Sequence, residues 1–323
     1  MISISQVRNG VIDELSRFNE RFESVLSHDD FLLNEVLKLI ASRKGKQMRP
    51  LLTLLSAKVF GEVNDHTLLS AVSLELMHTA SLIHDDVVDE SDERRGLLSV
   101  HKAYSNKVAV LSGDYLLGLA LKNVAMTGST ELMDLFSVTA QHLAQGELLQ
   151  LDTNSKNLSY DYYMDVIKNK TAVLFSACAK AGGMSVGCDN AILEQLSRVG
   201  EYIGICFQIK DDIFDYNPHS EIGKPTGNDM KEGKVTLPAL YALKQMDSKD
   251  FNDIARLIQQ GQANKLDIEK MRVLTLEQGG IEYAYSVIKD FADKAHQIID
   301  SFPDNRVKAS LHDYVVFVCD RAN

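Results

Sequence analysis

The sequence contains few cysteines, few prolines and no long uncharged apolar run. Its four cysteines lack metal-ligand spacing and stand among apolar or small residues, so we expect buried thiols in a reduced, cytoplasmic protein. Five prolines and few alternating strand-like runs favour an all-α fold. No uncharged apolar run approaches the roughly 20 residues of a membrane span, and residues 1–10 lack a signal-peptide core. We therefore expect a soluble protein with no transmembrane segment.

Positive charge is also in deficit, because 34 Lys and Arg residues face 45 Asp and Glu residues, giving a net charge of −11. This balance argues against a general nucleic-acid surface. It leaves anionic small molecules open, since local basic clusters and bound metal outweigh net charge at short range. Hydrophobic residues, at 45%, are sufficient for a large core, and no shift in composition marks a domain boundary. We expect one helical domain spanning residues 1–323.

Apolar residues recur at intervals of three to four in the N-terminal part of the chain, which predicts helix over residues 1–43 with a break at His28-Asp29-Asp30. A basic loop, residues 42–50, follows, and Pro50 is placed to open the next helix. Residues 108–121 predict a core helix rich in small residues, which we expect to form part of a cavity wall. Residues 168–171 precede another apolar stretch with small side chains.

One helix carries a row of polar residues toward its C-terminal end. His78, Ser81, Asp85 and Asp89 fall on one face, because steps of three and four residues return to the same side of a helix. The carboxylates of Asp85 and Asp89 repel each other and need a positive partner. Oxygen ligands in this arrangement suit Mg²⁺, which accepts one or two carboxylates together with water and substrate phosphates.

Arg94, Arg95 and Gly96 follow directly, where we expect the helix to have stopped. Guanidinium groups bind phosphate in a bidentate manner, so this pair of arginines suits a phosphorylated ligand. A single Asp-Asp-x-x-Asp on an exposed acidic helix would be unremarkable. The sequence Asp211-Asp212-Ile213-Phe214-Asp215 repeats the spacing, again after an apolar helical run. Two copies strongly favour a metal site.

Residues 217–233 are rich in proline and glycine and carry Lys224 and Lys231, and Lys234 follows directly. A basic loop directly after the second aspartate motif predicts a lid over an anionic ligand. We expect Asp229 to orient a lysine or a metal-bound water. Gln150, in the run of residues 145–152, is either an outer contact of the metal side or part of an ordinary helix face.

The chain resembles the trans-isoprenyl diphosphate synthases, also called polyprenyl synthetases. The resemblance rests on six blocks in order, listed here: Gly45-Lys46-Gln47-Met48-Arg49-Pro50, His78, Asp85-Asp86-Val87-Val88-Asp89 with Arg94-Arg95-Gly96, Lys170-Thr171, Gln208 with Asp211–Asp215, and Gly223-Lys224-Pro225 through Pro238. It implies a large helical bundle with a central cavity and a homodimer. It also implies two diphosphate substrates, isopentenyl diphosphate and an allylic diphosphate, with two to three Mg²⁺ ions per active site.

The resemblance also assigns roles to individual residues. Asp85, Asp89 and Asp211 would hold the Mg²⁺ ions that bind the allylic diphosphate. Arg94, Lys170, Lys224 and Lys234 would assist them at this diphosphate. Thr171 and Gln208 would stabilise the allylic cation. Isopentenyl diphosphate would be bound by Lys46, Arg49, His78 and Arg95. Gln47 stands where relatives often carry a basic residue.

Product length is expected to depend on the helix upstream of Asp85. Ser81 and Ala80 are small, Met77 lies further up, and no Phe or Tyr stands one turn before the motif. By resemblance this favours a long all-trans product of the octaprenyl type, whose apolar chain could bring the enzyme to a membrane surface for release. We expect Met77, or a leucine from residues 111–121, to form the floor. A shorter farnesyl or geranylgeranyl product is the alternative.

Three other functions fit the sequence less well. A class I terpene cyclase would carry a second motif of the Asn/Asp-Ser-Glu type, whereas this chain has Asp-Asp-Ile-Phe-Asp at residues 211–215. A non-catalytic subunit of a heteromeric synthase would usually have lost one or both aspartate motifs. A structural metal-binding bundle would leave the basic block at Lys46 and Arg49 without a role.

Overall fold

The computed structural model describes residues 2–42, 45–94, 96–151, 158–216, 227–246 and 248–321. Nearly all of these residues are helical, which confirms the predicted all-α class. The only strands in this part of the chain are β1 (Glu93–Arg94) and β2 (Leu97–Leu98). They pair antiparallel, with Glu93 opposite Leu98, and form a small hairpin after the first aspartate motif.

The helices follow one another with short connections. They are α1 (Ile4–Arg8), α2 (Ile12–Val25), α3 (Phe31–Ser42), α4 (Met48–Phe60), α5 (Asp65–Val88), α6 (Val100–Ala103), α7 (Asn106–Ala125), α8 (Thr130–Leu151), α9 (Tyr160–Ile167), η1 (Lys168–Ala172), α10 (Val173–Ser185), α11 (Asn190–Phe214), α12 (Asn228–Lys231), α13 (Leu237–Met246), α14 (Lys249–Gln259), α15 (Lys265–Glu277), α16 (Gly280–Asp300) and α17 (Arg306–Asp320). The element η1 is a single turn of π-helix.

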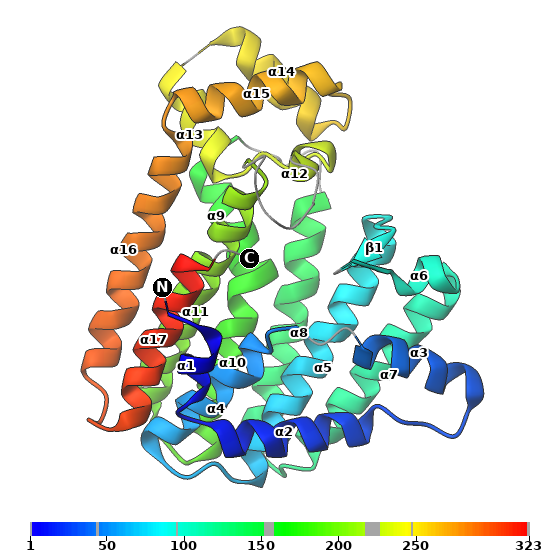
Figure 1. Ribbon diagram of the computed structural model, residues 1–323, viewed down its shortest axis with the longest axis vertical. Coiled ribbons are helices and arrows are strands. Elements are labelled where there is room, and N and C mark those ends of the chain that lie inside the picture. The colour runs from blue at the N-terminus through cyan, green and yellow to red at the C-terminus, as the bar shows by residue number, and fades with distance from the viewer. Residues whose placement is uncertain are drawn as a thin grey trace.

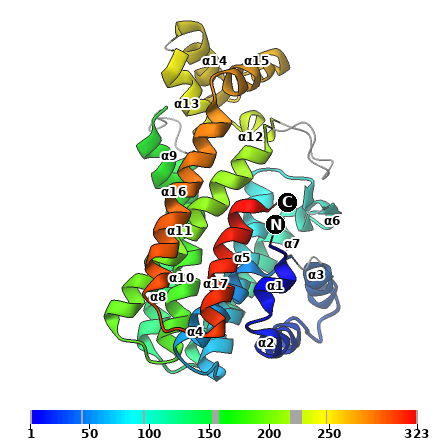
Figure 2. The ribbon, with the colours of Figure 1, turned by 60° about the vertical axis from the view of Figure 1, so that its left-hand side comes forward.

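The long helices run side by side, with α5, α10 and α11 inside the bundle and α16 and α17 along one side (Figure 1). Helix α2 crosses the lower end of the bundle, and the segment α12 to α15 covers the upper end in both views (Figure 2). Most buried apolar residues form one cluster in the bundle. A second, smaller cluster lies under α12 to α15 and includes Met230, Ala255 and Met271.

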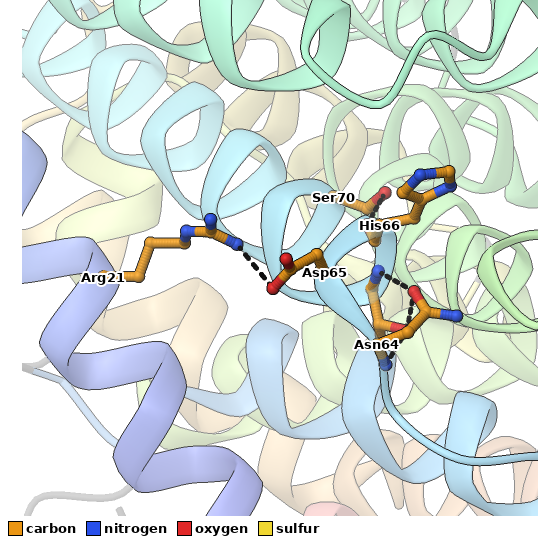
Figure 3. A network of polar contacts seen from close by, with 6 residues as sticks. Arg21, Asn64, Asp65, His66 and Ser70 are labelled. Carbon is orange, nitrogen blue, oxygen red and sulfur yellow. Dashed lines mark hydrogen bonds and ion pairs between the residues drawn. The ribbon is translucent and has the colours of Figure 1, made fainter.

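Helix α5 is fixed at its first turn. Asn64 accepts a hydrogen bond from the Thr67 amide (3.1 Å), and Thr67 Oγ1 accepts one from the Asn64 amide (3.3 Å), which forms a reciprocal cap (Figure 3). Asp65 accepts from Arg21 of α2 (3.5 Å), an ion pair at the positive end of the helix dipole (Figure 3). From this start, 24 residues carry the chain to the first aspartate motif.

Two glycines allow the inner helices to approach closely. A Cβ at Gly182 of α10 would lie 2.4 Å from the Thr53 carbonyl oxygen of α4. A Cβ at Gly204 of α11 would lie 2.5 Å from Cα of Ala172. A Cβ atom does not come this close to a non-bonded neighbour in real proteins. The spacing of α10, α4 and α11 therefore requires glycine at both positions.

The structure corrects two local predictions. The predicted helix over residues 1–43 is three helices, because the chain also turns at Asn9 to Val11, where Gly10 packs tightly against Ser310. The breaker-rich loop contains one helical turn, α12, beginning after Gly227 at φ 76°. Residues 217–226 of that loop, with Lys224, lie outside the described residues.

Within the described ranges, α7 alone is long and apolar enough to cross a membrane by length and composition. It packs against α5, with Ala109, Leu116 and Ala120 buried. On its other face Leu111 and Leu121 are 68% and 46% exposed. The predicted core helix over residues 108–121 therefore has one buried and one exposed apolar face.

Candidate active site

The two aspartate motifs end two parallel helices at the same end of the bundle. Asp85 lies in the last turn of α5, Asp89 is its C-terminal cap, and Asp211 lies in the last turn of α11. Both helices reach the end that α12 covers (Figure 1). The negative ends of two helix dipoles and several carboxylates meet here, so the site favours cations.

The first motif divides its carboxylates between two environments. Asp86 is buried and accepts a hydrogen bond from Nε of Arg94 in β1 (2.6 Å). Burial raises the pKa of Asp85 to about 6; nearby Lys170 acts to lower this pKa, whereas Glu147 and Asp89 raise it further. Repulsion at Asp85 therefore remains, and a bound cation would relieve it.

The second motif uses each carboxylate differently. Asp211 accepts a hydrogen bond from Arg321 (2.6 Å), and its side chain is 43% exposed. Asp212 is buried and accepts from the hydroxyl of Tyr163 in α9 (2.5 Å). Asp215 accepts from the amides of Asn228 and Asp229 (2.8 and 3.2 Å) and so anchors α12.

A polar network connects the second motif to η1. Thr171 Oγ1 donates to Gln208 Oε1 (2.7 Å), and Gln208 Nε2 donates to Asp212 Oδ1 (2.8 Å). Burial raises the pKa of Asp212 to about 7, although the bonds from Tyr163 and Gln208 act to lower it. The π-turn at η1, a feature frequent at functional sites, brings Thr171 into this network. The structure therefore brings Thr171 and Gln208, two residues to which the resemblance assigns one role, into direct contact.

The lysines predicted for the allylic diphosphate are paired with acidic residues. Lys170 contacts Glu147 of α8 (2.5 Å), and Lys234 contacts Glu232 (2.5 Å). Burial acts to lower the pKa of Lys234, but Glu232 and Asp89 outweigh it, so its pKa is raised. Arg94 is similarly engaged, by Asp86. Acidic side chains of the protein therefore hold these three cations beside the aspartates.

The block at residues 45–50 forms a basic corner beside α5. Arg49 donates to Nε2 of His78 (2.8 Å), and its guanidinium lies 4.7 Å from the centre of the Phe175 ring. The Lys46 carbonyl accepts from Arg8 of α1 (2.9 Å), which fixes the loop while the Lys46 side chain is exposed. Gln47 is in the left-handed region at φ 56° and bonds Asn19 (2.6 Å), so it anchors the loop. Of the predicted residues, Arg95 lies outside the described part.

A cavity of about 650 Å³ opens at this corner. Its lining residues are Phe22, Ile40, Ala41, Gly45, Gln47, Glu75, His78, Thr79, Leu82, Ile83, Asp86 and Arg94. His78 and Arg94 place polar groups in a largely apolar wall, an arrangement typical of small-ligand sites. The structure thus brings His78, Arg49 and Arg94 to one corner, adjacent to the aspartates.

A second, much smaller cavity, with room for about one water molecule, lies further along α5. It is lined by Ser70, Ser73, Leu74, Val124, Leu132, Leu135, Phe136 and Ala181. Leu74 is 11 positions before Asp85, about 16 Å along α5 at 1.5 Å per residue. Met77 and Ala80 are buried on α5 between this cavity and the motif, and Ser81 is half-buried. No leucine of residues 111–121 lines it: Leu116 is buried elsewhere in the core, and Leu111 and Leu121 are exposed.

The aspartates fit a metal whose coordination is completed by a ligand. Among the described residues no group of three or more His, Cys, Asp or Glu side chains could by itself hold an ion. Mg²⁺ usually takes only one or two protein carboxylates and fills the remaining positions with water and phosphate oxygens. Asp85 with Asp89, and Asp211 opposite, meet that requirement.

Sequence reasoning missed the partners that hold the site. Glu147, Tyr163 and the two middle aspartates, Asp86 and Asp212, carry no assigned role in the motif pattern, yet each fixes a functional side chain. Arg321, to which the sequence assigns no role, contacts Asp211 directly. A charged residue at a helix end gives no sequence signal of such a contact.

Comparison with known proteins agrees with this geometry. Residues 30–274 match the family model described as "Polyprenyl synthetase". The chain is 34% identical over 313 residues to octaprenyl diphosphate synthase of Escherichia coli, covering 96% of each chain.

Two solved structures are similar over nearly the whole chain. One is a polyprenyl synthase from Caulobacter crescentus CB15 complexed with calcium and isoprenyl diphosphate, at 31% identity and a TM-score of 0.92, covering 100% of this chain and 99% of that one. The other is a geranylgeranyl pyrophosphate synthase from Bacteroides thetaiotaomicron, at 42% identity and a TM-score of 0.87, covering 98% and 99%.

Proposed function

Because the chain belongs to the polyprenyl synthetase family and is therefore a prenyltransferase, we propose that it makes a long-chain all-trans polyprenyl diphosphate. In the proposed reaction, isopentenyl diphosphate condenses head to tail (1′-4) with an allylic diphosphate, with Mg²⁺ as cofactor and diphosphate as the leaving group. The observation that carries the proposal is the meeting of two aspartate motifs beside a separate basic corner. A reaction between two diphosphates needs both regions.

The aspartate side would bind the allylic diphosphate. Asp85 and Asp89 would hold Mg²⁺ from α5 and Asp211 would hold it from α11, two to three ions in all. When bound, the metal neutralises negative charge on the leaving diphosphate. Lys170 and Lys234 lie beside these aspartates and would bind diphosphate oxygens, as would Arg94 and Lys224.

The basic corner would bind isopentenyl diphosphate. The exposed amine of Lys46 and the guanidinium of Arg49 supply charge, His78 supplies a hydrogen bond, and Arg95 completes the set. Phe175 and Phe207 stack on Arg49 and fix its plane. The buried network of Thr171 and Gln208 presents oxygen dipoles where positive charge develops on the allylic carbon.

Small residues on α5 support a long product. Ala80 and Ser81 carry small side chains about one turn above the motif, and a small gap beside Leu74 and Phe136 lies further along α5, beyond Met77. The similarity to octaprenyl diphosphate synthase agrees with this. The competing candidate is a shorter, geranylgeranyl-type product, favoured by the 42% identity to a geranylgeranyl pyrophosphate synthase.

A product assay distinguishes the two. Purified protein, Mg²⁺, labelled isopentenyl diphosphate and farnesyl diphosphate are incubated, and the dephosphorylated products are sized by chromatography. We expect long products from the parent and much shorter ones from Ala80→Phe, whose ring would fill the path along α5. Met246→Phe, on the exposed face of α13, is the matched control and should leave product length unchanged. Short products from the parent would refute the long-chain proposal, and absence of condensation would refute the whole function.

We further propose that the enzyme is a cytoplasmic homodimer in which α7 lies at the interface. Leu111, Gly118 and Leu121 recur along one helix face; both leucines are exposed, and a Cβ at Gly118 would meet nothing within 4 Å. Leu111→Asp is expected to shift the sedimentation coefficient to that of a monomer. Leu266→Asp, at an exposed position on α15, should not.

A further inference from the structure

Arg321, at the end of α17, reaches into the candidate active site. Its Nη2 donates to the Asp211 carboxylate (2.6 Å) and to the Phe207 carbonyl (2.8 Å), both on α11. The guanidinium lies 3.7 Å from the centre of the Phe207 ring, and the side chain is only 10% exposed. A buried, stacked and hydrogen-bonded arginine has a defined position.

Arg321 contacts the carboxylate of the second motif that the proposed function makes a metal ligand, Asp211. Asp212 is occupied by Tyr163 and Gln208, and Asp215 by the amides of α12. The side chain of Asp211 is 43% exposed, whereas Asp212 is buried. Arg321 occupies Oδ1 of Asp211, so it competes with Mg²⁺ for this oxygen.

The surroundings also provide a second position for this cation. Lys46 approaches α17, with its amine 5.7 Å from the centre of the Phe317 ring, one turn before Arg321. Burial lowers the pKa of Lys46, and Arg321 lowers it further, which indicates two cations close together. An anion bound at Lys46 would attract Arg321 away from Asp211.

We propose that Arg321 is a positioning residue that holds Asp211 until substrate arrives, and then moves from the metal ligand to the diphosphate bound at Lys46. The inference rests on the proposed function, which makes Asp211 a metal ligand. In the free enzyme Arg321 weakens metal binding at the second motif. Diphosphate at the basic corner removes this competition, so the two sites are coupled, and the coupling is reciprocal.

Metal titration of the ligand-free protein tests this directly. Calorimetry with Mg²⁺ alone is compared for the parent, Arg321→Gln, Arg321→Lys and Asp211→Asn. We expect Arg321→Gln to bind Mg²⁺ about fivefold to tenfold more tightly, because the competitor is gone. Arg321→Lys should return the affinity toward that of the parent. Arg272→Gln is the control for losing one positive charge, since Arg272 contacts Glu269 instead, and it should bind Mg²⁺ as the parent does.

Kinetics provide the second measurement. Arg321→Gln is expected to raise the KM for isopentenyl diphosphate about tenfold, with a smaller change in kcat. Arg321→Lys should bring this KM most of the way back to that of the parent. Unchanged Mg²⁺ affinity in Arg321→Gln would overturn the inference while the proposed function stands. The tighter binding must also disappear in the Arg321→Gln/Asp211→Asn double variant. If Asp211→Asn alone leaves Mg²⁺ binding and activity intact, the proposed metal role of Asp211 fails instead.

Discussion

The two aspartate motifs share one spacing and differ in what surrounds them. On α5, Asp85 and Asp89 face the site while Asp86 turns inward to Arg94. On α11, Asp211 faces the site while Asp212 turns inward to Tyr163. The middle aspartate of each motif is buried and held by a partner, whereas the first aspartate is half-buried.

Helix geometry explains the common part of this pattern. Adjacent residues on a helix are separated by about 100°, so the aspartate at the second position of the motif cannot share the face of those at the first and fifth positions. The two motifs differ at the fifth position. Asp89 caps α5, whereas Asp215 accepts from the amides of Asn228 and Asp229 and connects its helix to α12. We infer that the first motif supplies two metal ligands, Asp85 and Asp89. The second motif supplies one metal ligand, Asp211, and Asp215 instead acts as a hinge.

The sharpest test of the comparison is Asp85→Asn. Losing the carboxylate is expected to reduce kcat/KM for the allylic diphosphate on the order of 10³-fold, because metal would no longer be held from α5. Without metal the variant should be at least as stable as the parent, since burial already disfavours the charge at Asp85. Steady-state kinetics and unfolding in EDTA measure both. Near-parental activity would contradict the assignment of Asp85.

The second test concerns Asp212, the buried middle aspartate of the second motif, and uses the pH dependence of stability. The pKa of Asp212 is raised from 3.8 to about 7, so between these values the folded protein binds a proton that the unfolded chain has released. Stability of the metal-free protein should therefore fall as pH rises from about 4 to about 7, by on the order of 3 kcal/mol from this group. Urea unfolding in EDTA at several pH values measures the slope. Asp212→Asn should flatten it, and an unchanged slope would refute the assignment.

The third test separates a hinge from a ligand. Asp215→Ala frees the amides of α12 and with them the segment that carries Lys234, so kcat/KM is expected to fall roughly tenfold to thirtyfold. Asp215→Asn keeps one acceptor oxygen and should lose less. Calorimetry should show Mg²⁺ affinity unchanged in both variants. Weakened Mg²⁺ binding, equal to that of Asp211→Asn, would make Asp215 a metal ligand.

The smallest expected effect is that of Tyr163→Phe. Removing the hydroxyl leaves the buried Asp212 with one fewer donor and should destabilise the protein by on the order of 1 kcal/mol at neutral pH. Tyr162→Phe is the matched control, because it removes a neighbouring hydroxyl that donates to the Leu149 carbonyl. Both should lower the urea midpoint, but only Tyr163→Phe should alter the pH dependence. An identical pH profile in the two variants would exclude the Tyr163–Asp212 bond as its source.

Much of this site was accessible from the sequence because it is carried by local spacing. The helices and the helix face shared by His78 and Asp85 follow from short-range patterns, whereas the contact of Thr171 with Gln208, 37 positions apart, appears only in the structure. The N-terminal helix was predicted too long, because a turn at Gly10 depends on its packing against Ser310. Short patterns predict where a helix runs better than where a neighbour ends it.

By itself, then, the sequence determined the all-α class, the two aspartate motifs and the basic corner, since each is set by residue type and by periodicity within one helix. Tertiary structure alone decided the partners: Glu147 for Lys170, Tyr163 for Asp212, and Arg321 for Asp211 across 110 positions. These contacts join separate helices, and their formation depends on how the bundle packs. No pattern within a single helix encodes that distance.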